Sequence, residues 1–314
     1  MIEADELGRV IFGCGNFGGM GSSPALRDKG DGRERALGLL DTARELGFTR
    51  FDTANTYGGG VSETVLGEWL RARGAAFRAG VEIATKVGNP VGCPPGERPL
   101  SRAQVAFHLE KSLRRLGVER IDLYYLHEFD VSTPLDETLE ALDRALAAGK
   151  IATFGVSNAT FADLEAVLAL VDGPMRRAFT HVQNGFNRLE TGDLAEVIPL
   201  AHAEGLAYVA FSPLAGGLLT GKYAPGEAAG PGTRVGDAPD YYSHLLTQET
   251  FAAIDALRRH ADTRGWTVAG AALRFILDTP GVDSLIIAPR SVEQIAAYGI
   301  SRRRPSRSNA ETAH

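Results

Sequence analysis

Short apolar runs alternate with amphipathic segments along almost the whole chain. Each run is bounded by polar or glycine-rich residues, as buried strands are, and the segments between the runs repeat apolar residues at helical spacing. Eight strand-then-helix units follow one another. The predicted strands are Val10–Phe12, Phe48–Ala54, Val81–Lys86, Ile121–Leu126, Ile151–Val156, Phe179–Gln183, Leu206–Phe211 and Ser284–Ile287.

The predicted helices complete the units, and Ser62 is placed as the N-cap of the second one. They cover residues 33–46, 63–73, 102–116, 135–148, 161–171, 193–204, 248–264, 268–277 and 292–298. Several end at a glycine, as helix C-termini often do: Gly47, Gly117, Gly149 and Gly205. Eight units in roughly 290 residues, with no break in composition, predict an α/β fold: a closed (β/α)8 TIM barrel in one domain over residues 1–300.

Three regions stand outside this pattern. Residues 1–8 are expected to form a short flap at the barrel bottom. Residues 212–246, rich in glycine and proline, form a long loop after the seventh strand, and loops of that length are usually functional. The polar and basic residues 301–314 are predicted to be a frayed end rather than a nucleic-acid arm.

Composition narrows the class of protein. A hydrophobic content of 44% is ordinary for a globular chain with a sizeable core. A net charge of -6 gives no electrostatic indication of binding to nucleic acid or to an anionic membrane. Cys14 and Cys93 lack the spacing of metal ligands, and two cysteines are too few to stabilise a chain this long by disulfide bonds. No run is apolar for the length of a membrane span, and the start MIEADELGR is not a signal peptide. A cytoplasmic location is expected, and the oligomeric state stays open.

A polar side chain stands at the end of each of three neighbouring predicted strands. Asp52 ends the second strand, Lys86 the third and His127 the fourth, while Tyr57 lies in the glycine-rich turn after Asp52. Each alone has a plain structural explanation: a turn cap, a surface cation and a buried histidine. Strand carboxyl ends share one face of such a barrel, so an acid, a base, a histidine and a phenol gathered there indicate a catalytic site.

These four residue types suit proton transfer to an oxygen. A tyrosine stays protonated at neutral pH, and a neighbouring ammonium is expected to lower its pKa. The carboxylate would hold the lysine, and the histidine would orient a carbonyl substrate. None of them supplies electrons, so a redox reaction needs a cofactor that delivers hydride.

The sequence resembles the aldo-keto reductases over nearly its whole length. The resemblance implies a (β/α)8 barrel that reduces aldehydes or ketones with a nicotinamide cofactor, usually NADPH, with Asp52, Tyr57, Lys86 and His127 as the catalytic tetrad and Tyr57 as the acid. The stretches that carry it, in order, are FDTANTYGGGVSETVLGEWL (51–70), IATKVG (83–88), IDLYYLHEFD (121–130), GKIATFGVSN (149–158), VQNGFN (182–187) and FSPLAGGLLTGKY (211–223).

The same resemblance implies a path for the cofactor. Ser157, Asn158 and Gln183 would hold the nicotinamide carboxamide, and Phe211 would stack on the ring. The pyrophosphate would follow the loop after it, along Ser212, Leu214 and Gly216. The plain alternatives are that Ser157 and Asn158 cap the next helix and that Phe211 is ordinary core.

The adenosine-phosphate end is expected at the last strand and helix. Arg290, Ser291 and Gln294 fall where such contacts would lie, beside a helix N-terminus. The chain departs from the family here, since Ala288-Pro289 replaces the usual Pro-Gly and Tyr298 stands where an asparagine is common. Arg290 is the one obvious positive charge for a 2′-phosphate. NADPH is favoured over NADH, mainly through the resemblance.

The first loop carries a G-x-G-x-x-G match, residues 13–18, that does not open a helix as a dinucleotide fingerprint must. We interpret it as a barrel loop near the substrate. Glu128 would either attract a polyhydroxylated or cationic substrate or face solvent. The candidate substrate-binding residues are Phe17, Met20, Asn89, Glu128 and Phe129, with Tyr241 and Tyr242 of the long loop nearby.

Two other functions compete with carbonyl reduction of a small molecule. A cofactor-binding regulatory subunit of the potassium-channel β-subunit type resembles these enzymes, and an intact tetrad does not exclude it. A metal-dependent barrel hydrolase is disfavoured, because the seven histidines form no H-x-H pair and no acid–histidine cluster with ligand spacing.

Overall fold

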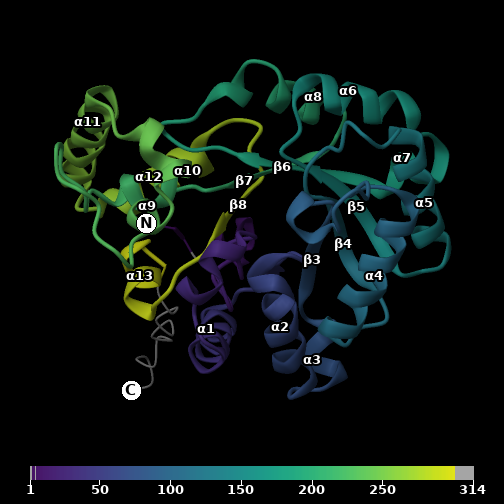
Figure 1. Cartoon of the computed structure of the whole chain (residues 1–314). Coiled ribbons are helices and arrows are strands. Elements are labelled where there is room, and N and C mark those ends of the chain that lie inside the picture. The colour runs from purple at the N-terminus through teal and green to yellow at the C-terminus, as the bar shows by residue number, and fades with distance from the viewer. Residues whose placement is uncertain (1, 4, 301–314) are drawn as a thin grey trace, which may run out of the picture.

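The eight predicted strands close into a parallel barrel. The computed structural model describes residues 2–3 and 5–300, and its strands pair in sequence order, with β1 also pairing β8. The (β/α)8 prediction is confirmed (Figure 1). The strands are β1 (Val10–Gly13), β2 (Arg50–Asp52), β3 (Glu82–Val87), β4 (Ile121–Leu126), β5 (Ile151–Ser157), β6 (Phe179–Gly185), β7 (Ala207–Phe211) and β8 (Ser284–Ile287).

Helices surround the barrel as the hydrophobic pattern predicts. Gly47 and Gly117 end α1 and α4 in the left-handed conformation, as C-caps. The short α3, α7, α9 and α10 were not predicted, because so few residues carry little periodicity. The helices are α1 (Arg33–Leu46), α2 (Val61–Arg71), α3 (Ala75–Ala79), α4 (Arg102–Leu116), α5 (Leu135–Ala147), α6 (Phe161–Leu170), α7 (Gly173–Ala178), α8 (Val197–Ala203), α9 (Arg234–Asp237), α10 (Pro239–Tyr242), α11 (Gln248–Arg264), α12 (Val268–Asp278) and α13 (Val292–Ala297).

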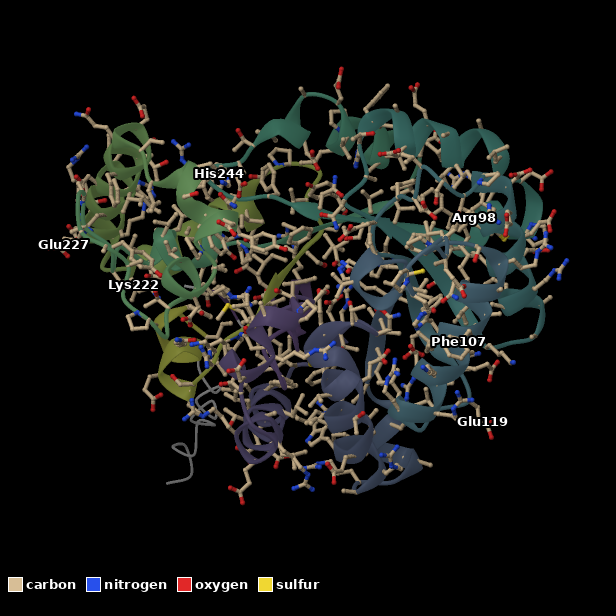
Figure 2. The ribbon with its side chains drawn as sticks, in the orientation of Figure 1. Arg98, Phe107, Glu119, Lys222, Glu227 and His244 are labelled. Carbon is tan, nitrogen blue, oxygen red and sulfur yellow. The ribbon has the colours of Figure 1, made fainter. Side chains whose placement is uncertain are left out.

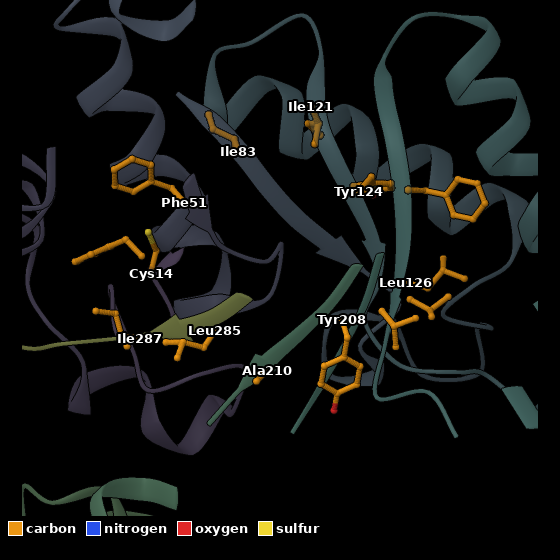
Figure 3. Packing of buried hydrophobic residues seen from close by; sticks show 14 of the residues in the cluster. Cys14, Phe51, Ile83, Ile121, Tyr124, Leu126, Tyr208, Ala210, Leu285 and Ile287 are labelled. Carbon is orange, nitrogen blue, oxygen red and sulfur yellow. The ribbon is translucent and has the colours of Figure 1, made fainter. Parts of the chain in front are cut away.

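The main core lies between the strands and the helices. Tyr124 and Leu126 of β4 belong to this layer (Figure 3). Their neighbours Leu123 and Tyr125 belong with Ala84 to a small cluster of their own. Because successive side chains of a strand point to opposite faces, the residues that alternate with the outer core fill the barrel interior. Asp52, Lys86 and His127 stand at the carboxyl end of that interior.

The loop 212–246 folds into a lobe that packs against the rest of the chain. It contains the 3-10 turn Ala215–Thr220, then α9, α10 and the turn Ser243–Leu245. Ala215, Leu218 and Val235 are buried in a second apolar cluster with residues of α11 and α12. Its polar side chains Lys222, Glu227 and His244 lie at the surface, away from Arg98, Phe107 and Glu119 on the other side of the molecule (Figure 2).

The N-terminal segment packs at the end of the barrel where the strands begin, as predicted. Arg9 donates to the backbone oxygens of Leu277 in α12 and of Val282 and Asp283 just before β8, and Arg274 of α12 pairs with Glu6. The predicted frayed tail, 301–314, lies outside the described residues. No helix in the described part of the chain is both long enough and apolar enough to cross a membrane.

Candidate functional site

Three strand ends bring the predicted tetrad into contact. Asp52 is the last residue of β2, Lys86 is next to last in β3, and His127 follows β4 directly. These strands are neighbours in parallel register, with Asp52 opposite Ala84. Parallel neighbours end on the same rim, which is why residues far apart in sequence meet here.

Lys86 is the centre of the cluster. Its side chain is 1% exposed, and its ammonium donates to Asp52 Oδ1 at 2.5 Å, to the Thr53 carbonyl at 2.9 Å and to Tyr57 Oη at 3.2 Å. An ammonium has three hydrogens, so every donor is used. Burial by itself lowers the pKa of Lys86, but Asp52 and Tyr57 together raise it above its ordinary value. Lys86 therefore stays charged at neutral pH.

The turn after Asp52 aims Tyr57 over Lys86. Gly58, Gly59 and Gly60 all have left-handed backbones, and a Cβ on Gly58 would lie 2.5 Å from the Phe17 carbonyl oxygen. Only glycine fits that position without strain. Lys86 Nζ donates to the phenol oxygen and sits 4.8 Å from the ring centroid. The hydroxyl proton of Tyr57 is thus left free for another acceptor.

The pKa of Tyr57 differs from the prediction. Lys86 lowers it, as expected, both by its charge and by its hydrogen bond. Burial raises it more, and the charge of Asp52 adds to that, so the pKa of Tyr57 ends above its ordinary value. The sequence indicates which charge lies beside the phenol, but it does not show how far the phenol is buried away from water.

His127 is a neutral group in this site. Burial, helped by the charge of Lys86, lowers its pKa to about 3. Its ring meets the Tyr57 ring edge-on, with centroids 5.7 Å apart. A neutral imidazole can donate or accept a hydrogen bond but holds no ionisable proton at neutral pH, which fits the predicted orienting role.

The first turn of α2 is hydrogen-bonded to β3 and to the ends of β1 and β2. The helix begins at Val61 with Gly60 as N-cap, so Ser62 is not the cap that the sequence predicted. The Ser62 hydroxyl instead contacts Thr53 Oγ1 at 2.7 Å and the Cys14 carbonyl at 2.9 Å. Next to it, buried Glu63 accepts from Thr85 Oγ1, beside Lys86, at 2.6 Å. The helix that follows Tyr57 is thereby anchored to β2, β3 and the end of β1.

The residues expected at the carboxamide lie at the ends of β5 and β6. Thr160 caps α6 with a capping box, so Ser157 and Asn158 are not its caps. Asn158 Nδ2 donates to the His127 carbonyl at 2.8 Å, and its backbone is left-handed, with φ 53°. Gln183 points into the barrel, where its Nε2 donates to Asp52 Oδ2 at 3.0 Å.

The end of β7 has an unusual backbone. Phe211 is partly buried and packs on the barrel-interior cluster of Ile11, Val209 and Ile286. Among the residues that the structure describes, the non-glycine residues with a left-handed φ are Asn158, Ser212 and Ala215, and the last two lie just after β7. Gly216, with φ 66°, continues this turn past Leu214. A left-handed backbone at a residue other than glycine is strained, and such strain is concentrated at functional sites.

At the end of β8, the predicted phosphate residues already have protein partners. Ser291 caps α13, and the Gln294 side chain accepts from the Arg290 backbone N–H at 2.7 Å. The Arg290 guanidinium donates through Nε to Asp31 at 3.3 Å. Burial raises the pKa of Asp31, although Arg290 and two other arginines lower it. No local pattern in the sequence signals this buried acid, which comes from the loop before α1.

The structure places two residues of the predicted substrate set in the interior. Phe17 is 0% exposed and packs on Phe12 in the main core, and Met20 is 3% exposed, so neither lines an open pocket. Loop length and polarity do not reveal which residues fold inward. Asn89 and Glu128 do meet, since Asn89 Nδ2 donates to Glu128 Oε1 at 2.6 Å. Burial raises the pKa of Glu128.

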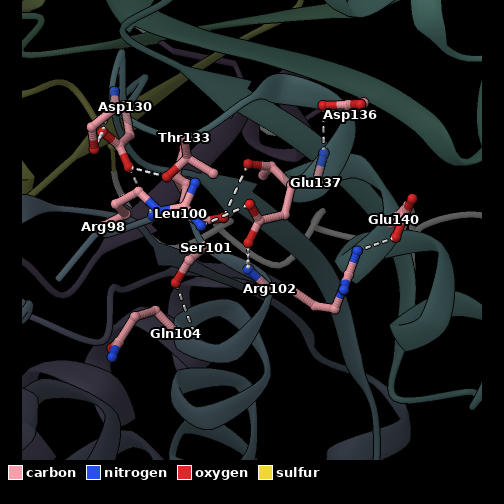
Figure 4. A network of polar contacts seen from close by, with 12 residues as sticks. Arg98, Leu100, Ser101, Arg102, Gln104, Asp130, Thr133, Asp136, Glu137 and Glu140 are labelled. Atoms are coloured by element: carbon pink, nitrogen blue, oxygen red, sulfur yellow. Dashed lines mark hydrogen bonds and ion pairs between the residues drawn. The ribbon is translucent and has the colours of Figure 1, made fainter.

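The loop that carries Glu128 and Phe129 is fixed by a polar network (Figure 4). Asp130 accepts from the Leu100 backbone N–H at 3.3 Å and from the Thr133 hydroxyl. Glu137 of α5 accepts from Arg98 at 2.8 Å and so joins the loop after β3 to α5, the helix that follows β4. The loops after β3 and β4 are therefore held as one unit beside His127.

Other features of the sequence resolve plainly. Residues 13–18 end β1 and enter turns, and the next regular element is the 3-10 segment Pro24–Lys29, so the G-x-G-x-x-G match opens no α-helix. Arg234, from the long loop after β7, donates to Asn16 Oδ1 in the loop after β1 at 2.6 Å, a contact that no local pattern signals. Within residues 2–3 and 5–300, no group of His, Cys, Asp or Glu side chains is arranged to hold a metal ion.

Comparison with known proteins decides the family. The family model described as "Aldo/keto reductase family" matches residues 9–298. The chain belongs to the aldo/keto reductase family. That assignment makes it an oxidoreductase of a family that generally binds nicotinamide cofactors.

Its relatives in the family are diverse. The chain is 38% identical to the uncharacterized oxidoreductase YrpG of Bacillus subtilis (strain 168) over 301 residues, 92% of this chain and 86% of that protein. It is 32% identical to L-glyceraldehyde 3-phosphate reductase of Escherichia coli (strain K12), over 83% of this chain and 77% of that protein. A probable voltage-gated potassium channel subunit beta of Arabidopsis thaliana is 29% identical, over 83% and 80%.

Proposed function

We propose that this aldo/keto reductase reduces an aldehyde or ketone to the alcohol, or runs the reverse reaction, with NADPH as the hydride donor. The observation that carries the proposal is the hydrogen bond from Lys86 to the Tyr57 oxygen. Because the phenol oxygen accepts from the ammonium, its own proton is free to be given to a substrate oxygen. A cytoplasmic location and a single domain over residues 1–300 remain part of the proposal.

The residues divide the work by their charge state. Bound NADPH supplies the hydride that no side chain can supply. Tyr57 donates its proton to the carbonyl oxygen, and the Lys86 ammonium stabilises the phenolate that is left. Asp52 balances the charge of Lys86 and holds it in place. Neutral His127, beside Tyr57, orients the carbonyl by a hydrogen bond.

The chain has features that fit a nicotinamide dinucleotide. Phe211 offers a partly exposed ring at the mouth, and Gly185 leaves the ring's edge uncovered, since even a Cβ there would approach it to 3.5 Å. Ser157 and Asn158 lie at the neighbouring strand end. The left-handed turn Ala215–Gly217 curls the backbone into the kind of concavity that binds anions.

The preference for NADPH over NADH rests on Arg290. Its Nε is bonded to Asp31, which leaves the terminal nitrogens of the guanidinium for a 2′-phosphate. The side chain is 28% exposed, so it is held yet reachable. Ser291 and Gln294 add the N-terminal turn of α13 to the same place.

A second candidate function is a cofactor-binding regulatory subunit. The observation in its favour is the similarity to a protein named as a potassium channel subunit beta.

Substrates of other relatives, such as L-glyceraldehyde 3-phosphate, are candidates for the panel of carbonyl substrates that tests the enzyme. The polar Asn89–Glu128 pair near the mouth favours polyhydroxylated aldehydes within that panel.

Cofactor titration followed by a carbonyl panel tests the proposal. We expect NADPH to quench protein fluorescence at lower concentration than NADH, and NADPH oxidation to follow the addition of an aldehyde. Tight binding with no turnover on any carbonyl would support the regulatory subunit. A protein that binds neither nucleotide would contradict both functions.

A further inference from the structure

Glu128 is a partly buried carboxylate without a cationic partner in the described part of the chain. It follows His127 directly, two residues after β4 ends. Its Oε1 accepts from Asn89 Nδ2 at 2.6 Å, whereas its Oε2 has no hydrogen bond to any residue that the structure describes. One oxygen of the carboxylate is therefore fixed, and the other is open to a ligand.

Asn89 fixes the position of this carboxylate. Its own Oδ1 accepts from the Val91 backbone N–H at 3.1 Å, as the N-cap of the 3-10 turn Pro90–Gly92. The amide nitrogen of Asn89 is thus the end left to face Glu128, and the residue is only 9% exposed. Because both ends of the amide are bonded, Glu128 Oε1 is held in one place.

The turn after Asn89 packs against the residue just before Tyr57. A Cβ on Gly92 would lie 2.7 Å from Thr56 Cγ2, so the two loops are in close contact. The Asn89–Glu128 hydrogen bond therefore lies between the loop that carries the proposed acid and the strand end that carries the histidine. A substrate whose carbonyl meets those two residues has the open oxygen of Glu128 on the neighbouring wall.

We propose that Glu128 selects substrates by charge: it favours carbonyl compounds that carry a positively charged group and disfavours those that carry a carboxylate or a phosphate. This inference rests on the proposed function and deepens it by naming the class of substrate. Glu128 determines specificity here and takes no part in proton transfer.

The physical reason is the cost of a partly buried charge that has no partner. Burial raises the pKa of the Glu128 carboxyl more than the Asn89 hydrogen bond lowers it, and no cation of the described chain offsets that cost. A cationic group on the substrate supplies the missing attraction, whereas an anionic group adds repulsion where water screens charge poorly. A neutral group gains at most a hydrogen bond. The expected order of substrates is therefore cation, neutral, anion.

Three aldehydes of one shape test this order. They are para-(trimethylammoniomethyl)benzaldehyde, para-neopentylbenzaldehyde and para-(carboxymethyl)benzaldehyde, in which a methylene group separates the charge from the ring and its carbonyl. We expect kcat/KM with NADPH to be about tenfold higher for the cation than for the neutral aldehyde, and about tenfold lower for the anion. The differences should lie in KM rather than kcat, since Glu128 acts away from the reacting atoms.

Two substitutions at Glu128 and one control assign the effect. Glu128→Gln removes the charge and keeps an oxygen that accepts from Asn89, so the three kcat/KM values should come within about threefold of one another. Glu128→Lys should reverse the order. Glu119→Gln removes an exposed acid two residues before β4 begins, at the opposite end of the same strand, and should keep the order of the parent. If Glu119→Gln changes the order as much as Glu128→Gln, the net charge of the protein selects the substrate and the inference fails.

A binding measurement keeps this inference separate from the proposed function. The matching benzamides accept no hydride, and calorimetry measures their affinity for the protein incubated with NADPH. If the cationic amide binds more tightly than the anionic one, and Glu128→Gln abolishes the difference, in a protein that reduces none of the three aldehydes, charge selection stands and the proposed function is overturned. Reduction of all three aldehydes with equal kcat/KM by the parent, or an order unchanged in Glu128→Gln, would overturn charge selection and leave the proposed function in place.

Discussion

At the residue scale, the candidate site is organised around a buried lysine whose donors are all used. Lys86 is a charge that would be costly inside a protein without partners. Asp52, the Thr53 carbonyl and Tyr57 supply one acceptor each. The arrangement fixes the phenol and leaves its proton free. Each of the three acceptors therefore stabilises the buried charge and, in the proposed reaction, also holds the ammonium in place for the chemistry.

Tyr57→Phe separates those two contributions. Without the phenol proton, carbonyl reduction should fall by about 10²–10⁴-fold, the usual effect of losing a general acid. The fold should lose about 1–2 kcal/mol, because buried Lys86 keeps two of its three acceptors. Steady-state kinetics and urea unfolding measure the two effects. Undiminished turnover would show that Tyr57 is not the acid.

The pH dependence of reduction follows from two pKa directions. Tyr57 must be protonated, and its pKa lies above the ordinary 10.0, so kcat/KM should stay level through the neutral range and fall only in strong alkali. His127, with a pKa of about 3, is neutral throughout and should add no acidic limb near pH 6.5. Initial rates from pH 5 to 10.5 test this. A limb near pH 6.5 that disappears in His127→Gln would contradict a neutral histidine.

At the element scale, α2 is the part that joins the tetrad to the barrel. It begins four residues after Tyr57, and its first turn binds β3 and the ends of β1 and β2 through Ser62 and Glu63. Arg115 of α4 closes the far side of Glu63, with Nε 2.7 Å from Oε2. The position of Tyr57 thus depends on how closely α2 packs against α4.

Gly67→Ala tests that packing. Alanine favours a helix by about 1 kcal/mol over glycine, but a Cβ at position 67 would lie 2.1 Å from the Arg115 carbonyl oxygen. We expect the clash to win and the variant to lose about 1–3 kcal/mol. Gly38→Ala, in α1 with nothing within 4 Å of the added Cβ, should instead gain up to about 1 kcal/mol. Urea unfolding of both variants decides, and a stabilised Gly67→Ala would contradict the close contact.

At the scale of the whole molecule, histidines couple folding to pH. The pKa of His181, on β6, is lowered to about 4, first by burial and then by the charge of Arg50. Below pH 6.5 the unfolded chain binds a proton there that the folded chain refuses, so stability falls as the pH drops toward 4. His127 acts in the same direction down to about pH 3.

His181→Gln should therefore flatten the acid side of the stability profile. Between pH 7 and 4.5 we expect the variant to lose about 2 kcal/mol less stability than the parent protein, whatever its stability at pH 7. His202→Gln, at an exposed position of α8, is the control and should follow the parent. Urea unfolding at several pH values measures the difference. Parallel profiles for His181→Gln and the parent would contradict the lowered pKa.

The sequence determined the barrel and most of its elements, and it predicted which four polar residues gather at one rim. Strand periodicity, helix amphipathicity and glycine caps are local properties, so β4, β8, α1, α4 and α11 begin and end where the pattern predicts. Asp52, Lys86 and His127 could be placed together because a parallel barrel brings consecutive strand ends to one rim.

Only the tertiary structure decided what each side chain contacts. It buried Phe17 in the core, turned Ser62 from a helix cap into a strand anchor and aimed Gln183 at Asp52. It also raised the pKa of Tyr57 although Lys86 lies beside it. Burial and hydrogen-bond geometry depend on groups supplied by distant segments, and spacing along the chain does not contain that information.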